Sequence, residues 1–147
     1  MTKLPEGWTR ISSSIHYRDT RGMMDWLMNA FGFEERIAVP GENGEIVHGE
    51  LELPGGILMI SPADTGEPER FGLRRASPAD VGGANTQTLQ LYVDDADAHF
   101  ERAKAAGATI VQEPFISDHG EDYWADKSYG CLDPEGHLWW IVERIRG

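Results

Sequence analysis

The sequence predicts an α+β protein made of two βαβββ modules, and three repeated features lead to this prediction. A helix-like stretch follows a strand-like stretch twice, opening at Asp19 and again at Asp95. A glycine stands after each helix-like stretch, at Gly32 and at Gly107. The short turns PGG and PEG precede the last strand-like stretch of each half. The second half of the chain therefore repeats the order of the first.

In the first module, weak alternation in ISSSIHYR predicts a strand over 11–18. Asp19 and Thr20 are good N-cap residues, and apolar residues at helical spacing then predict an amphipathic helix. These apolar residues are Met23, Trp26, Leu27 and Ala30. Three more strands are predicted, over 33–39, 46–53 and 57–61, with Asn43 and Gly44 marking a hairpin turn.

The second module begins with a strand predicted over 88–93. Asp94 and Asp95 then cap a helix that carries Ala96, His99, Phe100 and Ala103 on one face. A strand over 108–114, a polar loop over 117–127 and a closing hairpin complete the module. The two strands of that hairpin are predicted over 128–133 and 136–143.

The stretch between the modules is rich in proline, glycine and charged residues and has few apolar positions. This composition predicts a connector with little regular structure. We therefore expect one domain over 1–147, with a first module at 8–61, a connector at 62–87 and a second module at 88–147.

The charge of the chain bears on its partners. It carries 25 Asp and Glu residues against 13 Lys and Arg, a formal net charge of −12. Without a basic stripe to neutralise a phosphate backbone, we expect no nucleic-acid partner.

No apolar run approaches the roughly 20 residues of a membrane helix and no apolar signal core is present, so we expect a cytoplasmic protein with no membrane partner. The single cysteine, Cys131, excludes an intrachain disulfide.

Three stretches resemble motifs of the vicinal-oxygen-chelate superfamily, which includes glyoxalases, extradiol dioxygenases and bleomycin-resistance proteins. They are MMDWLMNAFGFEE at 23–35, LYVDDADAHFERAKAAGATIV at 91–111 and YGCLDPEGHLWW at 129–140. The resemblance implies two βαβββ modules whose sheets curl into a cup, with the helices packed outside. It also implies a homodimer, because members with two modules in one chain commonly pair.

The resemblance further implies where a metal centre would lie. Metal-dependent members use His or Gln on the first strand and Glu on the last strand of each module. The corresponding positions here are Ser12 and Thr88 on the first strands and Met59 and Trp140 on the last strands. Because such a centre needs imidazole and carboxylate ligands, we expect no metal at the usual place and predict no cofactor.

Two alternatives keep an enzyme open at the level of the sequence. One is a relocated metal site that would draw on His16, His48, Glu50 or His119. The other is general-base catalysis by His16 without a metal, since the ordinary pKa of histidine lies near neutral pH. Glu50 is a candidate to orient that imidazole.

Strand parity predicts which side chains would line the cup, because successive residues of a strand point to opposite faces. The predicted ligand-binding residues are Ser12, Ser14, His16, Met59, Gln90, Tyr92, Trp124, Tyr129 and Trp140. Trp124 and Tyr129 are expected in an aromatic loop near the rim. Trp139 is expected to face the helix and Trp140 the cup, which its indole either lines or plugs.

These residues predict a glyoxalase- or bleomycin-resistance-like protein, metal-free, that binds a small planar organic molecule by stacking and hydrogen bonding. The acidic charge would suit a cationic ligand, although a solvated acidic surface explains the same charge. The alternative is a lyase-, isomerase- or dioxygenase-type enzyme, metal-free or with a relocated metal, acting on an unknown small metabolite.

Overall fold

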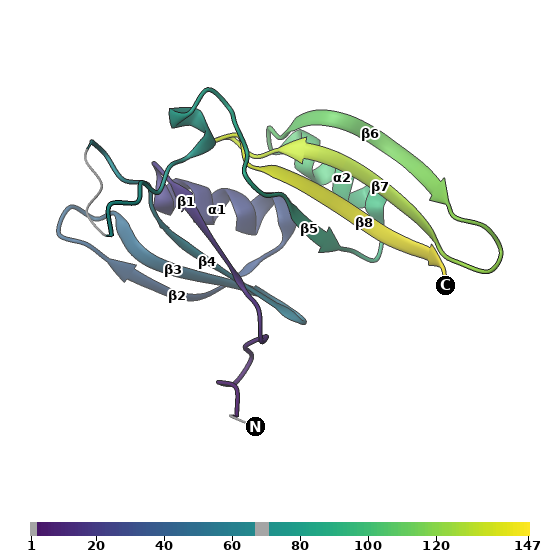
Figure 1. Ribbon diagram of the computed structural model, residues 1–147, viewed down its shortest axis with the longest axis horizontal. Coiled ribbons are helices and arrows are strands. Elements are labelled where there is room, and N and C mark those ends of the chain that lie inside the picture. The colour runs from purple at the N-terminus through teal and green to yellow at the C-terminus, as the bar shows by residue number, and fades with distance from the viewer. Residues whose placement is uncertain (1–2, 67–70) are drawn as a thin grey trace. The chain divides into compact units, whose positions relative to one another are not determined.

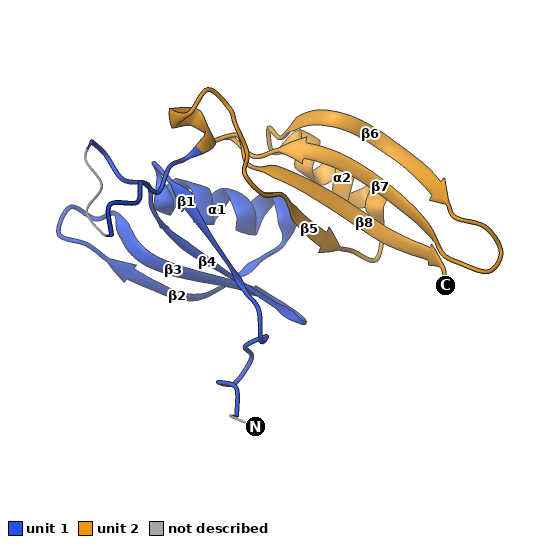
Figure 2. Ribbon diagram, viewed as in Figure 1, with its two compact units in different colours: residues 1–77 blue, residues 78–147 orange. Residues whose placement is uncertain are grey.

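The computed structural model describes residues 3–66 and 71–147, which form two four-stranded mixed sheets, each with one helix (Figure 1). The chain divides into two compact units, residues 1–77 and 78–147 (Figure 2). Each unit contributes strand, helix and three strands in that order. The α+β class and the two βαβββ modules predicted from the sequence are therefore confirmed.

The first unit consists of β1 (Ser13–Tyr17), α1 (Thr20–Phe31), β2 (Glu34–Pro40), β3 (Ile46–Leu53) and β4 (Gly56–Pro62). Its strands lie in the order β1-β4-β3-β2. The first and last strands of the module, β1 and β4, run parallel, and the other neighbouring pairs are antiparallel. The sheet does not close on itself, since β1 and β2 both remain edge strands.

Local signals set the ends of α1. The carboxylate of Asp19 accepts a hydrogen bond of 2.9 Å from the N–H of Gly22, as an N-cap residue does. Gly32 follows the last turn with a φ of 78°, and its N–H donates to the carbonyl of Met28. The side of the helix that faces the sheet is apolar, and Met24 on it is fully buried. The helix thus begins and ends where the sequence predicts.

The second unit consists of a short 3-10 turn η1 (Pro78–Asp80), β5 (Leu89–Tyr92), α2 (Ala96–Ala105), β6 (Thr109–Asp118), β7 (Ala125–Leu132) and β8 (Leu138–Arg146). Its strands lie in the order β5-β8-β7-β6, with β5 parallel to β8. This order repeats that of the first unit strand for strand. No helix of the described chain is long and apolar enough to cross a membrane.

Two carboxylates hold the start of α2. Asp95 accepts a hydrogen bond of 2.9 Å from the N–H of Ala98, and Glu143 of β8 accepts one of 2.8 Å from the N–H of Ala96. The second bond ties the helix to the sheet below it. Gly107 stands after the helix with a φ of 97°.

The predicted polar loop over 117–127 is wrong at both ends. Residues 117 and 118 belong to β6, and residues 125–127 belong to β7, with Asp118 paired to Ala125. The start of β7 tolerates charged residues because ion pairs offset their charges. Asp126 binds Arg144, and Lys127 binds Asp97. The hairpin loop itself spans only 119–124.

The N–H of Ala63, at the start of the predicted connector, donates a hydrogen bond of 2.8 Å to the carbonyl of Tyr17 in β1, and a second set of bonds lies within the connector itself. Asp64 is 5% exposed, and its carboxylate accepts hydrogen bonds from both the backbone and the guanidinium of Arg75. The side-chain hydrogen bond from Arg75 lowers the pKa of Asp64. Residues 67–70 of the predicted connector lie outside the described residues.

Candidate functional site

Each sheet has one face covered by its helix and one face without a helix, called here the helix-free face. In the first unit, a Cβ built on Gly49 would lie 2.5 Å from the sulfur of Met24 in α1. Leu51, two residues on, is fully buried. Because alternate residues of a strand point to opposite faces, His48 and Glu50 of β3 lie on the helix-free face.

Three predicted ligand-binding residues share this face of the first unit. Two of them, Ser14 and Met59, are paired with each other, and Met59 also pairs with Glu50, so Ser14, Met59 and Glu50 form a row across β1, β4 and β3. His16 stands opposite Ser61. Its Nδ1 lies 2.8 Å from the hydroxyl oxygen of Ser61. The row and the histidine together give this part of the sheet a polar surface.

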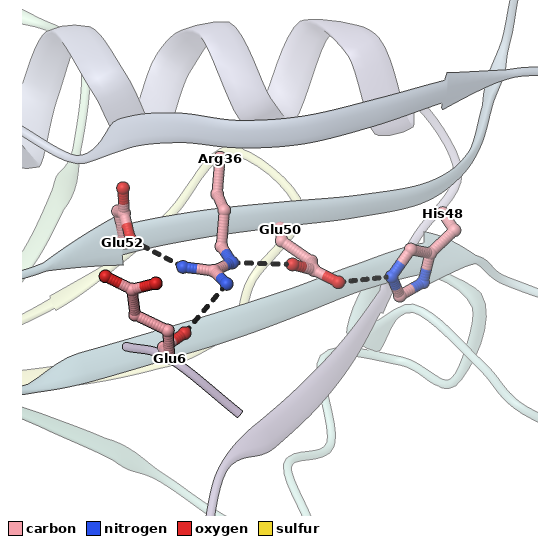
Figure 3. Close-up of polar contacts among 5 residues, drawn as sticks. All are labelled: Glu6, Arg36, His48, Glu50 and Glu52. Atoms are coloured by element: carbon pink, nitrogen blue, oxygen red, sulfur yellow. Dashed lines mark hydrogen bonds and ion pairs between the residues drawn. The ribbon is translucent and has the colours of Figure 1, made fainter. Parts of the chain in front are cut away.

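A charged network occupies the neighbouring part of the same face (Figure 3). One oxygen of Glu50 lies 3.0 Å from Nε2 of His48, and the other accepts a hydrogen bond of 3.1 Å from Nε of Arg36. The guanidinium also donates to Glu52 at 3.3 Å and to the carbonyl of Glu6 at 2.9 Å. The sequence prediction that Glu50 orients His16 is therefore wrong. Glu50 orients His48 instead.

A β-bulge explains why Arg36 reaches this network. The pairing of β2 with β3 shifts between Glu35 and Ile37, so Arg36 is the extra residue of the bulge. Bulges commonly re-aim a side chain relative to the regular alternation of a strand. The periodicity of the sequence does not reveal this position, and the sequence analysis did not select Arg36.

In the second unit, the two adjacent tryptophans point to opposite faces of the sheet, and hydrogen bonds fix the first of them. Trp139 is 2% exposed, and its indole N–H donates a bond of 3.1 Å to Asp133. The other carboxylate oxygen of Asp133 accepts bonds of 3.1 Å from the N–H groups of Glu135 and His137. Asp133 thus fixes both the turn and the helix-facing tryptophan, and Trp140 lies on the helix-free face.

Trp140 sits among side chains from three strands on that face. A Cβ on Gly130 of β7 would lie 3.0 Å from the indole, so glycine leaves the room that the ring needs. Phe115 of β6 packs edge-on against it, with ring centroids 6.5 Å apart at 81°. Gln90 of β5 pairs with Trp140 from the other side. The indole is half-buried in this setting.

Further along the same face, an arginine contacts two exposed aromatic rings. The guanidinium carbon of Arg144 lies 5.8 Å from the ring centroid of Tyr92 and 5.6 Å from that of Trp124. Arg144 donates hydrogen bonds to Asp126 at 2.5 Å and to the hydroxyl of Tyr92 at 3.1 Å. The bond to Asp126 raises the pKa of Arg144. The two rings lie beside an ion pair that supplies both donors and acceptors.

Sequence reasoning missed three members of this surface, Phe115, Asp126 and Arg144. Two of them fall at or near the stretch that was interpreted as an irregular loop. The strand parity that identified Trp140 would have found Arg144 as well, since it lies four residues on in β8.

The predicted place of Tyr129 at the rim is wrong. Tyr129 is fully buried on the helix-facing side of β7, where its hydroxyl is hydrogen-bonded to Nδ1 of His99 in α2. Burial raises its pKa well above the ordinary value. Tyr129 pairs with the fully buried Ile141. Its neighbour Gly130 faces Trp140 on the helix-free side, so alternation turns Tyr129 toward the helix.

The residues at the superfamily's usual metal positions do not fit a metal centre. In each unit, the last-strand position pairs with the residue two places after the first-strand position. These pairs are Met59 with Ser14, after Ser12, and Trp140 with Gln90, after Thr88. The same offset in both halves supports the assignment of the four positions. Two hydroxyls, a thioether and an indole do not supply the imidazole and carboxylate ligands that such a centre requires.

The residues predicted for a relocated metal site are divided between the two units. His48 and Glu50 are in contact, whereas the His16 ring bonds Ser61 and the His119 ring packs 4.9 Å from that of Trp124 in the other unit. Within residues 3–66 and 71–147, no three or more His, Cys, Asp or Glu side chains are grouped so as to hold a metal ion.

Most of the chain matches known proteins. The family model described as the glyoxalase/bleomycin resistance protein/dioxygenase superfamily matches residues 13–141. The uncharacterized protein Mb0911c of Mycobacterium bovis is 31% identical over 136 residues, which cover 92% of this chain and 84% of that protein. The uncharacterized protein Rv0887c of Mycobacterium tuberculosis is also 31% identical, and the match covers 92% of this chain and 75% of that protein.

Solved structures share the fold. TioX from Micromonospora sp. ML1 superposes with a TM-score of 0.66 at 32% identity, covering 92% of this chain and 95% of that one. A glyoxalase/bleomycin resistance protein/dioxygenase family enzyme from Burkholderia phytofirmans PsJN gives a TM-score of 0.63 at 19% identity, covering 90% of this chain and 96% of that one.

Proposed function

This chain belongs to the glyoxalase/bleomycin resistance protein/dioxygenase superfamily, and we propose that it binds a small planar organic molecule on the helix-free face of its β5–β8 sheet. The observation that carries the proposal is the gathering of four aromatic rings on that one face. They are Tyr92, Phe115, Trp124 and Trp140. Flat aromatic side chains bind planar ligands by stacking, and a few polar groups then fix the orientation.

Polar groups with the required chemistry lie among these rings. Gln90 pairs with Trp140 and offers an amide donor and acceptor. Arg144 and Asp126 offer a guanidinium and a carboxylate beside Tyr92 and Trp124. The predicted contacts Ser12, Ser14, His16 and Met59 belong to the first unit and form no part of the face proposed here. We propose binding without a metal, because the usual metal positions carry unsuitable side chains.

A planar cation suits this surface better than a planar anion. The net charge of −12 attracts cations at long range, and exposed indole faces bind cations directly. We therefore expect cationic ligands to bind more tightly than neutral ones of the same shape. The advantage should shrink as salt is added, because salt screens the long-range attraction.

A thermal-shift screen of planar aromatic compounds, followed by calorimetry on the hits, tests the proposed site. Trp140→Ala and Trp124→Ala should each weaken binding of a hit by about 1 kcal/mol or more, roughly fivefold in Kd. Trp26→Ala is the matched control, since Trp26 lies on α1 and packs against Phe31. If neither substitution weakens any hit, the ligand site lies elsewhere.

Elemental analysis of protein purified without chelator tests the metal-free part of the proposal. Stoichiometric iron, zinc, manganese or nickel would contradict it.

We also propose a homodimer, the assembly common among two-module members of this superfamily. Sedimentation equilibrium should give twice the mass of one chain, and a monomer at all concentrations would refute the dimer.

A further inference from the structure

Part of the aromatic face has the chemistry of a cation-binding site, and a side chain of the protein itself occupies it. The guanidinium carbon of Arg144 lies 5.8 Å from the ring centroid of Tyr92 and 5.6 Å from that of Trp124. The guanidinium also donates hydrogen bonds of 2.5 Å to Asp126 and 3.1 Å to the hydroxyl of Tyr92. Proteins use aromatic rings placed around a positive charge to bind quaternary ammonium ligands. The group formed by Tyr92, Trp124 and Asp126 is called here the cation cage.

Arg144 is held loosely enough to be displaced from the cation cage. Its side chain is 37% exposed, and ion pairs near the surface add little to stability, because water solvates the separated charges. Among the described residues, its guanidinium bonds to one carboxylate and one hydroxyl. Arg36 of the first unit differs, since two carboxylates and a backbone carbonyl hold it. The guanidinium of Arg144 is therefore the easier of the two to displace.

The rings of the cation cage are open to a molecule from solvent. Tyr92 is 55% exposed and Trp124 is 41% exposed, whereas the side chain of Asp126, which Arg144 contacts, is 14% exposed. A ligand therefore reaches the rings first, and it gains the carboxylate only when the guanidinium moves away.

We propose that the cation cage binds the positively charged group of an organic ligand, and that Arg144 is a competing occupant which this group displaces. The inference rests on the ligand site proposed above, and it assigns the residues that give the site its preference for cations. A neutral group that displaced Arg144 would leave the carboxylate of Asp126 without a counter-charge, whereas a cation restores it. The exchange therefore selects cations over neutral molecules of the same shape.

Choline and its neutral carbon analogue 3,3-dimethylbutan-1-ol are suitable probes, because they have nearly the same shape and differ in charge. Binding of each is followed by NMR titration of the indole N–H signal of Trp124. Arg144→Gln removes the competing occupant, so this variant should bind choline more tightly than the wild type does, by about fivefold or more in Kd. The neutral analogue should gain no affinity from the same substitution.

Arg146→Gln is the matched control for the loss of one positive charge. It removes an arginine from the same strand and changes the net charge by the same amount, but Arg146 pairs with Asp118 and not with Asp126. This variant should bind choline as the wild type does. Adding Asp126→Asn to Arg144→Gln should abolish the gain, because the cation cage then lacks its carboxylate.

A second measurement needs no variant and so does not depend on whether Arg144→Gln folds. Rising concentrations of choline should shift the Nε–H NMR signal of Arg144 in the wild type, because the guanidinium leaves Asp126 as the ligand enters. The corresponding signal of Arg146 should stay in place. A shift of the Trp124 indole signal with no shift at Arg144 would overturn the exchange.

These outcomes separate the cation cage from the wider ligand site. An unchanged Kd for choline in folded Arg144→Gln would overturn the cage, and so would an equal gain in Arg146→Gln or with the neutral analogue. If Trp140→Ala weakens the aromatic hits while Arg144→Gln gains nothing, the ligand site stands and the cage is wrong. If Arg144→Gln gains choline affinity while Trp140→Ala weakens no hit, the cage stands and the wider ligand site is wrong.

Discussion

Asp133→Ala should lower the free energy of unfolding by about 2–6 kcal/mol, the sum of three lost hydrogen bonds. The Asp133 side chain is 3% exposed and accepts bonds of 3.1 Å from Glu135, His137 and Trp139. The indole N–H is the costliest donor, because Trp139 is 2% exposed and a buried donor without a partner costs about 1–3 kcal/mol. Each of the two turn N–H groups, which are less deeply buried, adds about 0.5–1.5 kcal/mol.

Urea unfolding followed by far-UV circular dichroism measures this loss by linear extrapolation. Tryptophan fluorescence is a poorer signal, because the substitution changes the surroundings of Trp139 directly. Asp133→Asn is the matched variant. It keeps an oxygen for the turn but replaces the indole's acceptor with an amide nitrogen, so it should cost about 1–3 kcal/mol.

A double-mutant cycle shows whether the indole bond is the cause. Trp139→Phe removes the donor, so Asp133→Asn should cost less in that background than in the wild type. An unfolding free energy that Asp133→Ala leaves unchanged would refute the reasoning. It would also remove the argument that this bond holds Trp139 toward α2 and leaves Trp140 on the opposite face.

Three other regions give further predictions. Gly49→Ala should destabilise the protein by about 1–3 kcal/mol through overpacking, because its Cβ would lie 2.5 Å from the sulfur of Met24. The loss should be smaller in a Met24→Ala background, and an equal loss would exclude that contact as the cause. The hydrogen bond from Arg146 is the main reason that the pKa of Asp118 is lowered to about 2. A carboxyl with a depressed pKa stabilises the fold above its unfolded pKa and loses this contribution as the pH falls through its folded pKa. Asp118→Asn should therefore flatten the fall in Tm between about pH 4 and pH 2, and an unchanged fall would contradict this. Burial raises the pKa of the Cys131 thiol to about 12, so Ellman's reagent should label it only in guanidinium. Rapid labelling of the native protein would show that the thiol is accessible.

The sequence predicts the helices and the duplication well because short-range rules govern them. Asp19 and Asp95 stand before their helices and cap them, and Gly32 has the positive φ that favours glycine there. The amphipathic spacing that marks α1 corresponds to its buried face. These signals depend on neighbours in the chain, so one sequence is enough to read them.

Long-range contacts account for the failures. The ends of β6 and β7 look like loop because Asp126 and Lys127 are charged, and their partners, Arg144 and Asp97, lie far away in the sequence. Tyr129 was predicted at the rim because the first residues of β7 were taken for a loop. The bulge at Arg36 breaks the strand alternation, so parity alone does not place its side chain beside Glu50.

Strand parity predicts which face of a sheet a side chain takes, but it does not predict which residues on that face are in contact. Trp140 and Gln90 follow from the alternation of β8 and β5. The link between His48 and Glu50 spans only one residue, yet the sequence does not say which histidine the carboxylate contacts. That choice depends on the three-dimensional pairing of β1, β3 and β4.

The central claim is that the ligand binds on the aromatic helix-free face of the second unit, and indole N–H NMR tests it most directly. The five tryptophans of the chain provide both the probes and the controls. Titration with a planar aromatic hit should shift the signals of Trp124 and Trp140 and leave those of Trp26 and Trp139 in place. Saturable binding that leaves Trp124 and Trp140 unshifted would contradict the account.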